Sequence, residues 1–240
     1  MIIGINGKIG SGKDTVGKII QWLTKPELDG QYIGFQTYDD YTLEKLSPFK
    51  IKKFAGKLKE TASLLTGIDV EKFEDQEFKK TNLGPEWSYE LVGEDWVDGK
   101  PVLIPMTVRT LLQKLGTEAM RDGLHTNVWV NALFADYKEQ PNKAVAEFLA
   151  AEGLSQSMNA GQTELPNWII TDMRFPNEME AVELREGVTI KVVRPGTSVG
   201  THPSETALDD AYFDHVISND GTIEDLVEKV RQILTIERII

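Results

Sequence analysis

The chain has 240 residues, of which 40% are hydrophobic and 27% charged, and this composition is typical of a soluble globular protein rather than a disordered or collagen-like one. The formal net charge of -12 disfavours nucleic-acid binding, and the absence of cysteine excludes disulfides, thiolate metal sites and cysteine nucleophiles. No apolar run approaches the ~20 residues that span a bilayer, and Met1–Ile5 is too short for a signal-peptide core, so we expect a cytoplasmic protein without a membrane partner.

The first elements expected along the chain are a strand, a glycine-rich loop and a helix. Ile2–Ile5 is short and apolar, as expected for a buried strand. Lys13–Leu23 follows, and the spacing of Val16, Ile19 and Leu23 places them on one side of a helix. This order predicts that the loop opens a helix directly after a strand.

A second strand and helix are expected next. Phe49–Phe54 alternates apolar and basic residues, which indicates a strand with one buried face. In the helix that follows, Leu58, Ala62 and Leu65 are predicted to point inward.

The middle of the chain is less regular. Residues 69–100 mix acidic and aromatic residues around a hairpin turn expected at Asp98-Gly99, and we interpret this part as an insertion. Two consecutive helices are predicted over Thr107–Arg121 and Thr126–Tyr137, and residues 140–166 are expected to form a partly helical excursion.

Toward the carboxy terminus, strands again alternate with helices. Three strands are predicted: Trp168–Ile170, Val188–Val193 and His215–Ile217. Pro176 is suited to a first helical turn, and Thr222 with Asp225 resembles a capping box that opens a final helix. This alternation predicts an α/β fold in which a parallel sheet is covered by helices on both faces.

The residues Gly7 to Thr15 match the GxxxxGK pattern of a phosphate-binding loop. Because this loop joins a strand to a helix, its amide groups and the positive helix end are expected to converge on an anion. Lys13 can reach phosphate oxygens, whereas the alternative is an ordinary glycine-rich turn with a solvated lysine. Asp14 stands where such loops usually carry a hydroxyl, so Thr15 or ordered water is expected to serve the metal instead.

Two polar residues follow the strand Trp168–Ile170, at the sheet edge where doubly wound folds bind ligands. Asp172 is a candidate for the water shell of a magnesium ion, and its alternative role is a helix cap or turn. Arg174 could grip a transferring phosphoryl group or the acceptor phosphate through its planar guanidinium. A surface ion pair with Glu178 is the alternative for Arg174.

Further candidates lie on a helix and in a loop. Arg109 and Gln113 are four residues apart and share a helix face, which suits a nucleotide phosphate and base. Arg121 is rotated away from them unless the helix ends first, and solvated surface positions are the alternative for all three. Arg194 begins a segment rich in proline and glycine that extends to Glu205 and is a candidate lid.

Four parts of the chain resemble the phage-type deoxynucleoside monophosphate kinases, within the P-loop nucleoside monophosphate kinase superfamily. They are GKIGSGKDT at 7–15, FAGKLKE at 54–60, LLQKLGTEAMR at 111–121 with Trp129 beyond it, and TDMRFPNE at 171–178 followed by HPSE at 202–205. The resemblance implies a three-layer P-loop NTPase fold with a central, mainly parallel sheet. It also implies a single kinase domain over 1–240, with a mostly helical substrate-binding insertion over 69–166 and a short lid over 195–206.

The resemblance further implies transfer of the terminal phosphate of ATP to a deoxynucleoside monophosphate, with magnesium, for DNA synthesis. The residues implied for ATP are Gly10, Ser11, Gly12, Lys13, Asp14, Thr15 and Arg194. Those implied for the monophosphate substrate are Arg109, Gln113, Arg121, Trp129 and Glu205. The implied catalytic residues are Lys13, Arg174 and Asp172, and the implied metal ligands are Thr15 and Asp172. The implied partners are small nucleotides. A homodimer is also compatible with the resemblance, because the superfamily includes dimers. If a phage encodes the chain, it would act in the host cytoplasm.

Two other functions are compatible with these residues. One is a related small-molecule kinase that phosphorylates dephospho-coenzyme A or phosphomevalonate, which the FAGKLKE segment permits. The other is a nucleotide-dependent switch that does not catalyse transfer. ATP binding without phosphate transfer to any acceptor would favour the switch.

Overall fold

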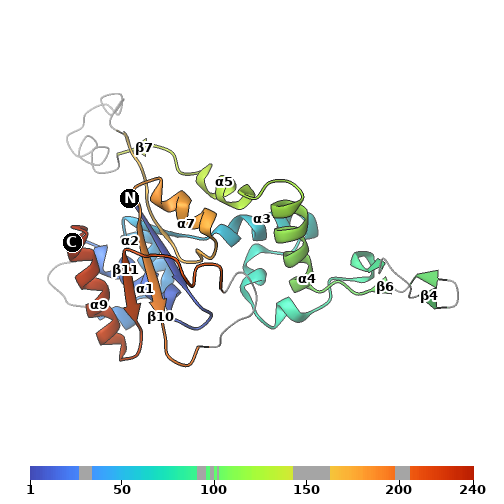
Figure 1. The fold of residues 1–240 in the computed structure, drawn as a ribbon, viewed down its shortest axis with the longest axis horizontal. Coiled ribbons are helices and arrows are strands. Elements are labelled where there is room, and N and C mark those ends of the chain that lie inside the picture. The colour runs from blue at the N-terminus through green and yellow to red at the C-terminus, as the bar shows by residue number, and fades with distance from the viewer. Residues whose placement is uncertain (27–33, 91–95, 98–99, 102, 143–162, 198–205) are drawn as a thin grey trace. The chain divides into compact units, whose positions relative to one another are not determined.

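The computed structural model describes residues 1–26, 34–90, 96–97, 100–101, 103–142, 163–197 and 206–240 (Figure 1). The chain forms two compact units. Unit 1 comprises Met1–Phe54 and Leu133–Ile240, and unit 2 comprises Ala55–Ala132. Unit 2 is therefore inserted into the sequence of unit 1.

Unit 1 is built on a sheet of five parallel strands in the order β11-β10-β1-β9-β2. Their bounds are Ile2–Gly7 for β1, Phe49–Lys52 for β2, Asn167–Ile170 for β9, Val188–Val193 for β10 and His215–Ser218 for β11. In the register of the central strand, Ile5 lies opposite Ile190, and Ile3 lies opposite Ile169. The strands predicted in this part of the chain are confirmed, and the sheet is parallel as expected.

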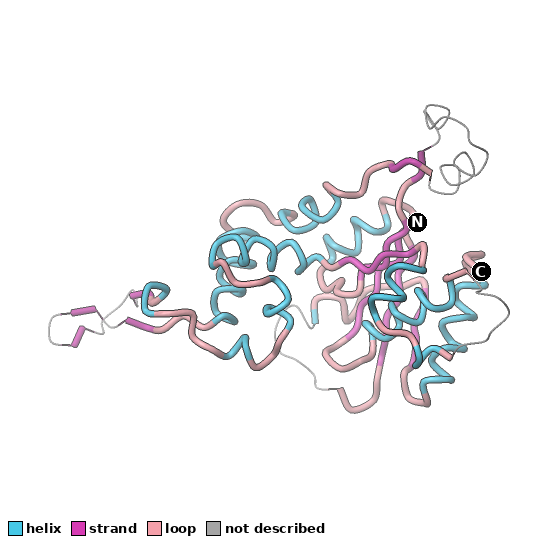
Figure 2. The backbone as a smooth tube through the Cα atoms, turned by 180° about the vertical axis from the view of Figure 1, so that it is seen from behind, coloured by secondary structure: helices cyan, strands magenta, loops and turns pink. Residues whose placement is uncertain are grey.

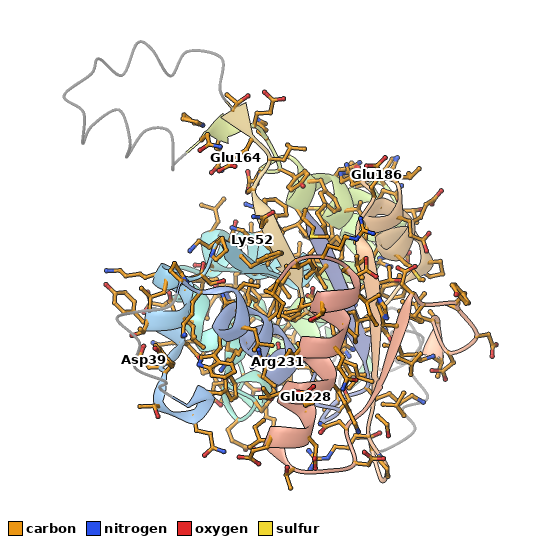
Figure 3. The ribbon with its side chains drawn as sticks, turned by 90° about the vertical axis from the view of Figure 1, so that its left-hand side faces the viewer. Asp39, Lys52, Glu164, Glu186, Glu228 and Arg231 are labelled. Carbon is orange, nitrogen blue, oxygen red and sulfur yellow. The ribbon has the colours of Figure 1, made fainter. Side chains whose placement is uncertain are left out.

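One face of the sheet is covered by α1 (Lys13–Thr24) and α9 (Ile223–Ile236). The buried side chains there include Ile3, Ile5, Val16, Ile19, Ile169, Ile190, Leu226 and Val230. The capping box predicted for the last helix is confirmed, because Thr222 accepts from Asp225 N while Asp225 accepts from Thr222 N. On the solvent side of α9, Glu228 and Arg231 form an ion pair (Figure 3).

The other face of the sheet is covered by α7 (Pro176–Glu183), which begins at a proline as predicted. Side chains alternate between the two faces of a strand, so Gly4 of β1 faces away from α1. A Cβ built on Gly4 would lie 3.2 Å from Val182 Cγ2, so α7 packs closely on the strand. The helices therefore lie on both faces of the sheet, and the α/β fold of P-loop type is confirmed (Figure 1, and from behind Figure 2).

Unit 1 also contains elements that the sequence patterns did not predict. Helix α2 (Asp40–Leu46) is capped by Asp39, whose side chain accepts from Thr42 N, and η1 is a short 3-10 helix at Phe35–Thr37. The strands β7 (Gln140–Pro141) and β8 (Thr163–Glu164) pair antiparallel. The ends of the excursion expected over 140–166 are thus paired strands rather than helices, and its residues 143–162 lie outside the described ranges.

Unit 2 is mostly helical in the ranges that the structure describes. The helices that lie in unit 2, or extend from it by one or two residues into unit 1, are α3 (Phe54–Thr66), η2 (Val70–Glu74), η3 (Phe78–Lys80), η4 (Pro85–Trp87), α4 (Val108–Gln113), η5 (Lys114–Asp122) and α5 (Val128–Phe134). Its short strands are β3 (Tyr89–Glu90), β4 (Trp96–Val97), β5 (Lys100–Pro101) and β6 (Leu103–Ile104). The antiparallel pairs are β3 with β6 and β4 with β5. The second pair flanks the turn predicted at Asp98-Gly99, two residues that are themselves not described.

Two expectations for the helices of unit 2 are wrong in detail. Leu65 was expected to point inward, but it is 52% exposed, whereas Ala62 is fully buried. Three positions turn an α-helix by about 300°, so Leu65 lies about 60° to one side of Ala62 and at the edge of the buried face. The second helix is also shorter than the predicted Thr126–Tyr137, because α5 begins at Val128 and ends at Phe134. None of the helices in the described ranges has the length and apolar character that a bilayer crossing requires.

Candidate active site

The loop between β1 and α1 has the backbone conformation of an anion-binding turn. Gly10 and Gly12 have φ angles of 79° and 96°, in the left-handed region that side chains rarely adopt. Ser11 lies between them, and its amide donates to Lys8 O at 3.0 Å. Alternation of left-handed and ordinary residues turns successive N–H groups toward one side, where an anion can bind.

Lys13 lies against this loop rather than in solvent. The residue is only 8% exposed, and its Nζ donates to Lys8 O at 3.4 Å. The ammonium group is therefore held close to the loop main chain.

Ser11 has a buried hydroxyl with no hydrogen-bond partner among the described residues. A Cβ built on Gly7 would lie 2.4 Å from this Oγ, so a side chain at position 7 has no room. A buried hydroxyl without a partner costs about 1–3 kcal/mol. An anionic oxygen from a ligand would offset that cost.

Asp14 cannot serve a metal as the usual neutral hydroxyl does, but its carboxylate makes a hydrogen bond and an ion pair within unit 1. Its Oδ1 accepts from Thr171 Oγ1 at 3.0 Å and lies 3.2 Å from Lys53 Nζ. Burial raises the pKa of Asp14, but the Lys53 charge and the Thr171 hydrogen bond outweigh that effect and hold the pKa below its usual value. The carboxylate is therefore charged at neutral pH and joins α1 to the ends of β2 and β9.

Asp172 follows β9, as predicted, and contacts the start of α3. Its Oδ1 accepts from the main-chain amide of Phe54 at 2.8 Å. This hydrogen bond is the helix-cap role given above as the alternative to magnesium binding. Within the described ranges, no three His, Asp or Glu side chains gather into a metal site. Magnesium needs no such protein cage, because it commonly takes one or two carboxylates together with phosphates and water.

Arg174 lines a pocket of about 180 Å³ in unit 1, beside the phosphate loop. The other polar residues that line it are Asn6, Lys8, Lys191, Thr197 and Asp209. Three of the lining residues, including Arg174 itself, carry positive charge, which suits a phosphate-bearing ligand.

Two lysines organise the wall of this pocket. Lys8 Nζ lies 3.4 Å from Asp209 Oδ2. Lys191 Nζ donates to the main-chain oxygens of Leu208 and Asp209 at 3.1 and 2.8 Å. These contacts attach the segment around Asp209 to the pocket.

The backbone at Arg174 is held by Glu178, which is 3% exposed. The Glu178 carboxylate accepts from the amides of Arg174 and Phe175 at 2.7 and 3.1 Å. Glu178 therefore fixes the main chain at Arg174 and Phe175, just before α7 begins.

Three polar residues around this site were not found from the sequence. Lys8 lies inside the loop motif, but the motif does not specify its residue type. Lys53 ends a basic run after β2, and Lys191 interrupts the apolar residues of β10. The interruption is the one local signal that could have identified Lys191, because a charged side chain inside a buried strand needs a partner.

The substrate residues expected on a helix all belong to unit 2. Arg109 and Gln113 lie on α4 and are exposed, and Arg109 Nη2 is 3.5 Å from Gln76 Oε1. Arg121 lies on η5, which continues α4 as a π-helix. The helix predicted over Thr107–Arg121 is therefore confirmed, but its second half is π-helical rather than α-helical. Because a π-helix has wider turns, the angular position of Arg121 does not follow from α-helical spacing.

Trp129 is a packing residue in unit 2. It is 7% exposed, and its indole Nε1 donates to Gly116 O at 2.9 Å. The backbone is close-packed here, because a Cβ on Gly116 would lie 2.9 Å from Leu58 Cδ2. The contact explains why a tryptophan stands at this position, and a role of Trp129 in binding substrate stays a prediction.

Of the two lid candidates, Arg194 is described and Glu205 is not. Arg194 is exposed directly after β10, and its main-chain oxygen accepts from Thr197 Oγ1 at 2.9 Å in a turn. Residues 198–205 of the predicted lid lie outside the described ranges.

Comparison with known proteins gives a consistent set of matches. A family described as deoxynucleotide monophosphate kinase matches residues 100–230, which is more than half of the chain. A deoxynucleotide monophosphate kinase of Enterobacteria phage T4 is 30% identical over 131 residues, 54% of this chain and 46% of that protein. One of Escherichia phage RB69 is 29% identical over 129 residues, 53% of this chain and 45% of that protein. The matches thus cover about half the length of these two relatives. A deoxynucleoside-5'-monophosphate kinase of Escherichia phage T5 is 27% identical over 254 aligned positions, 91% of this chain and 89% of that protein.

Proposed function

Because the chain belongs to the deoxynucleotide monophosphate kinase family, we propose that it transfers the terminal phosphate of ATP to a deoxynucleoside monophosphate. The products are ADP and the deoxynucleoside diphosphate, which supplies DNA synthesis. The observation that carries this proposal is the loop of left-handed glycines with Lys13 folded against it, on a sheet of P-loop type. The two compact units then act together as one kinase domain.

The loop residues from Gly10 to Thr15 are the proposed site for the ATP phosphates. Amides of the loop and the Lys13 ammonium stabilise the negative charge that shifts during transfer. The buried Ser11 hydroxyl, which has no hydrogen-bond partner in the described part of the chain, and the tight space at Gly7 fit a bound phosphate. Magnesium, when bound, would neutralise phosphate charge, and Thr15 and Asp172 are the proposed residues that hold it directly or through water.

Arg174 is the proposed bridge between donor and acceptor phosphates. It lines the same pocket as Lys8 and Lys191, and its planar guanidinium can contact two phosphate oxygens at once. Phosphoryl transfer depends mainly on positioning and electrostatic stabilisation, so the reaction needs no strong general base. We assign Arg174 and Lys13 to the transferring group on this ground.

The acceptor nucleotide is proposed to contact Arg109, Gln113, Arg121 and Trp129 of unit 2. Arginine suits the monophosphate, and the glutamine amide can donate to and accept from a base. Arg194 and Glu205 are proposed to belong to a lid that excludes water, because hydrolysis of ATP competes with transfer.

A kinase of the dephospho-coenzyme A or phosphomevalonate type is the second enzyme hypothesis. It would use the same loop and the same basic pocket. The family match over residues 100–230 favours deoxynucleotides as acceptors, because that range contains the proposed acceptor residues on α4 and η5.

One experiment separates these functions. The full chain is incubated with ATP, magnesium and each common deoxy- or ribonucleoside monophosphate, and also with dephospho-coenzyme A and phosphomevalonate. Formation of deoxynucleoside diphosphates is expected, with the Lys13→Ala variant as the inactive control. Transfer to dephospho-coenzyme A or phosphomevalonate alone, or ATP binding with no transfer to any acceptor, would contradict the proposal.

A further inference from the structure

Asn219 contacts the phosphate loop from the far end of the chain. It follows β11 directly, and its Nδ2 donates to Ser11 O at 2.8 Å across a sequence separation of 208 residues. Neither the loop motif nor any of the roles proposed above includes this residue. Both residues belong to unit 1, so the contact lies within one compact unit.

The main chain around Asn219 is held on both sides. Its own amide donates to Val193 O at 2.7 Å, at the end of the neighbouring strand β10. Lys229 Nζ on α9 donates to Ser218 O at 2.6 Å and to Asp220 Oδ1 at 2.9 Å. The asparagine side chain is therefore presented to the loop from a rigid support, as effective positioning groups require.

The hydrogen bond to Ser11 O determines how one loop peptide is oriented. A trans peptide is planar, and its C=O and N–H groups point in opposite directions. Because Ser11 O faces Asn219, the Gly12 N–H faces away from Asn219. Without this contact, a peptide next to a glycine can rotate at little steric cost.

The space beside Gly12 is filled by the same side chain. A Cβ built on Gly12 would lie 2.4 Å from Asn219 Nδ2, and the φ of Gly12 is +96°. Two independent features, the left-handed backbone and the close approach of Asn219, therefore require glycine at this position. The loop and Asn219 form one packed arrangement.

We propose that Asn219 is a positioning residue of the phosphate loop, which holds the Ser11–Gly12 peptide so that the Gly12 amide faces the bound triphosphate. The inference rests on the proposed function only in that the loop binds a triphosphate. It makes Asn219 a residue that acts through the loop without contacting the nucleoside.

The test compares Asn219→Ala with wild type by calorimetric titration with inorganic tripolyphosphate and with ATP. Loss of one neutral hydrogen bond that orients a loop amide is expected to weaken both ligands about fivefold to tenfold. Asn219→Asp has nearly the same shape, but it places a carboxylate opposite Ser11 O, and a larger loss is expected. Asn167→Ala is the matched control, because the Asn167 side chain accepts a hydrogen bond from the amino group of Met1 at 3.0 Å instead. Both ligands should bind this variant with an affinity within twofold of wild type.

Two results would overturn the proposal. Unchanged tripolyphosphate binding in a folded Asn219→Ala or Asn219→Asp protein would show that the loop does not need this contact. A loss for ATP without a loss for tripolyphosphate would place Asn219 against the nucleoside. Thermal unfolding identifies any variant that does not fold, and the other variant then decides. The titration needs no turnover, so a wild-type protein that binds tripolyphosphate but transfers no phosphate would refute the kinase function and leave the Asn219 inference standing.

Discussion

Lys53 Nζ lies 3.2 Å from Asp14 Oδ1, so the carboxylate that directly follows the loop lysine Lys13 forms an ion pair. Thr171, at the end of β9, donates to the same oxygen at 3.0 Å. The negative charge of Asp14 is compensated within unit 1 before any phosphate binds. The unusual residue at this position thereby joins the first helix to two strand ends.

This pair predicts how stability depends on pH. The folded pKa of Asp14 lies below its unfolded value of about 3.9, so its stabilising contribution is fully present above that pH. The contribution is lost as the pH falls through the folded pKa. The Asp14→Asn protein is expected to be less stable than wild type at pH 7, by about 1 kcal/mol or less, because the Asp14 side chain is 55% exposed.

Urea unfolding at several pH values measures this difference. The difference between wild type and Asp14→Asn should begin to shrink below about pH 4, where the carboxylate of the unfolded chain becomes protonated, and should vanish once the folded carboxylate is protonated at lower pH. Lys53→Met, alone and combined with Asp14→Asn, isolates the contribution of the pair. A difference that stays constant down to pH 2 would contradict the ionic origin.

Replacement of Lys13 is expected to stop turnover without unfolding the protein. Removal of a group that stabilises transition-state charge typically lowers kcat by about 10²–10³-fold. Lys13→Met keeps the packed stem of this buried side chain, and Lys13→Ala removes it. Both variants should lose activity in a coupled kinase assay and keep the wild-type circular dichroism spectrum. Full activity in either folded variant would refute the assignment of the loop.

Arg174→Ala is expected to lower kcat much more than it lowers ATP affinity. The guanidinium is assigned to the transferring phosphate, so its contribution is largest in the transition state. Arg174→Lys keeps the charge but not the planar fork, and should recover only part of the rate. Steady-state kinetics with ATP and with the monophosphate substrate measure the split. A loss of ATP binding proportional to the loss of rate would contradict the bridging role.

Asp172 has a measurable structural role, which can be separated from a role in metal binding. Asp172→Ala removes the acceptor for Phe54 N, and loss of a helix cap is expected to cost about 1 kcal/mol in thermal or urea unfolding. Asp172→Asn keeps an oxygen acceptor and should retain most of that stability. If Asp172 also serves magnesium, the asparagine variant needs more magnesium for half-maximal rate. An unchanged magnesium dependence would leave Asp172 with the cap alone.

Trp129→Phe tests whether the buried indole acts on structure or on substrate. The variant keeps an aromatic ring but leaves Gly116 O without this donor, and about 1 kcal/mol of stability should be lost. If Trp129 only packs, the relative kcat/KM values for different deoxynucleoside monophosphates stay as in wild type. A changed order of preference among these substrates would show that the indole contacts the acceptor.

Much of the fold follows from short-range patterns. The strands of the parallel sheet are marked by apolar runs, and α9 begins at the predicted capping box because Thr222 and Asp225 satisfy each other locally. The phosphate loop is recognisable because glycine and lysine at defined spacing have direct backbone consequences. Helix α2 was missed, since its one buried residue, Leu43, leaves no apolar row to detect. The π-helical stretch after Gln113 was missed because helical spacing does not distinguish it from an α-helix.

The linear order of residues thus defines which segments become strand, loop and helix, since those choices depend on neighbours within a few positions. The residues that contact the loop and the start of α1 lie far away in the sequence, so short-range patterns do not reveal them. Asp14 meets Thr171 across 157 residues and Ser11 meets Asn219 across 208, because β1 lies between β9 and β10, with β11 beside β10. Strand order depends on how hydrophobic faces pack together over the whole chain. Contacts between residues so far apart in the sequence therefore form only when the sheet assembles, and no periodic pattern in the sequence marks them.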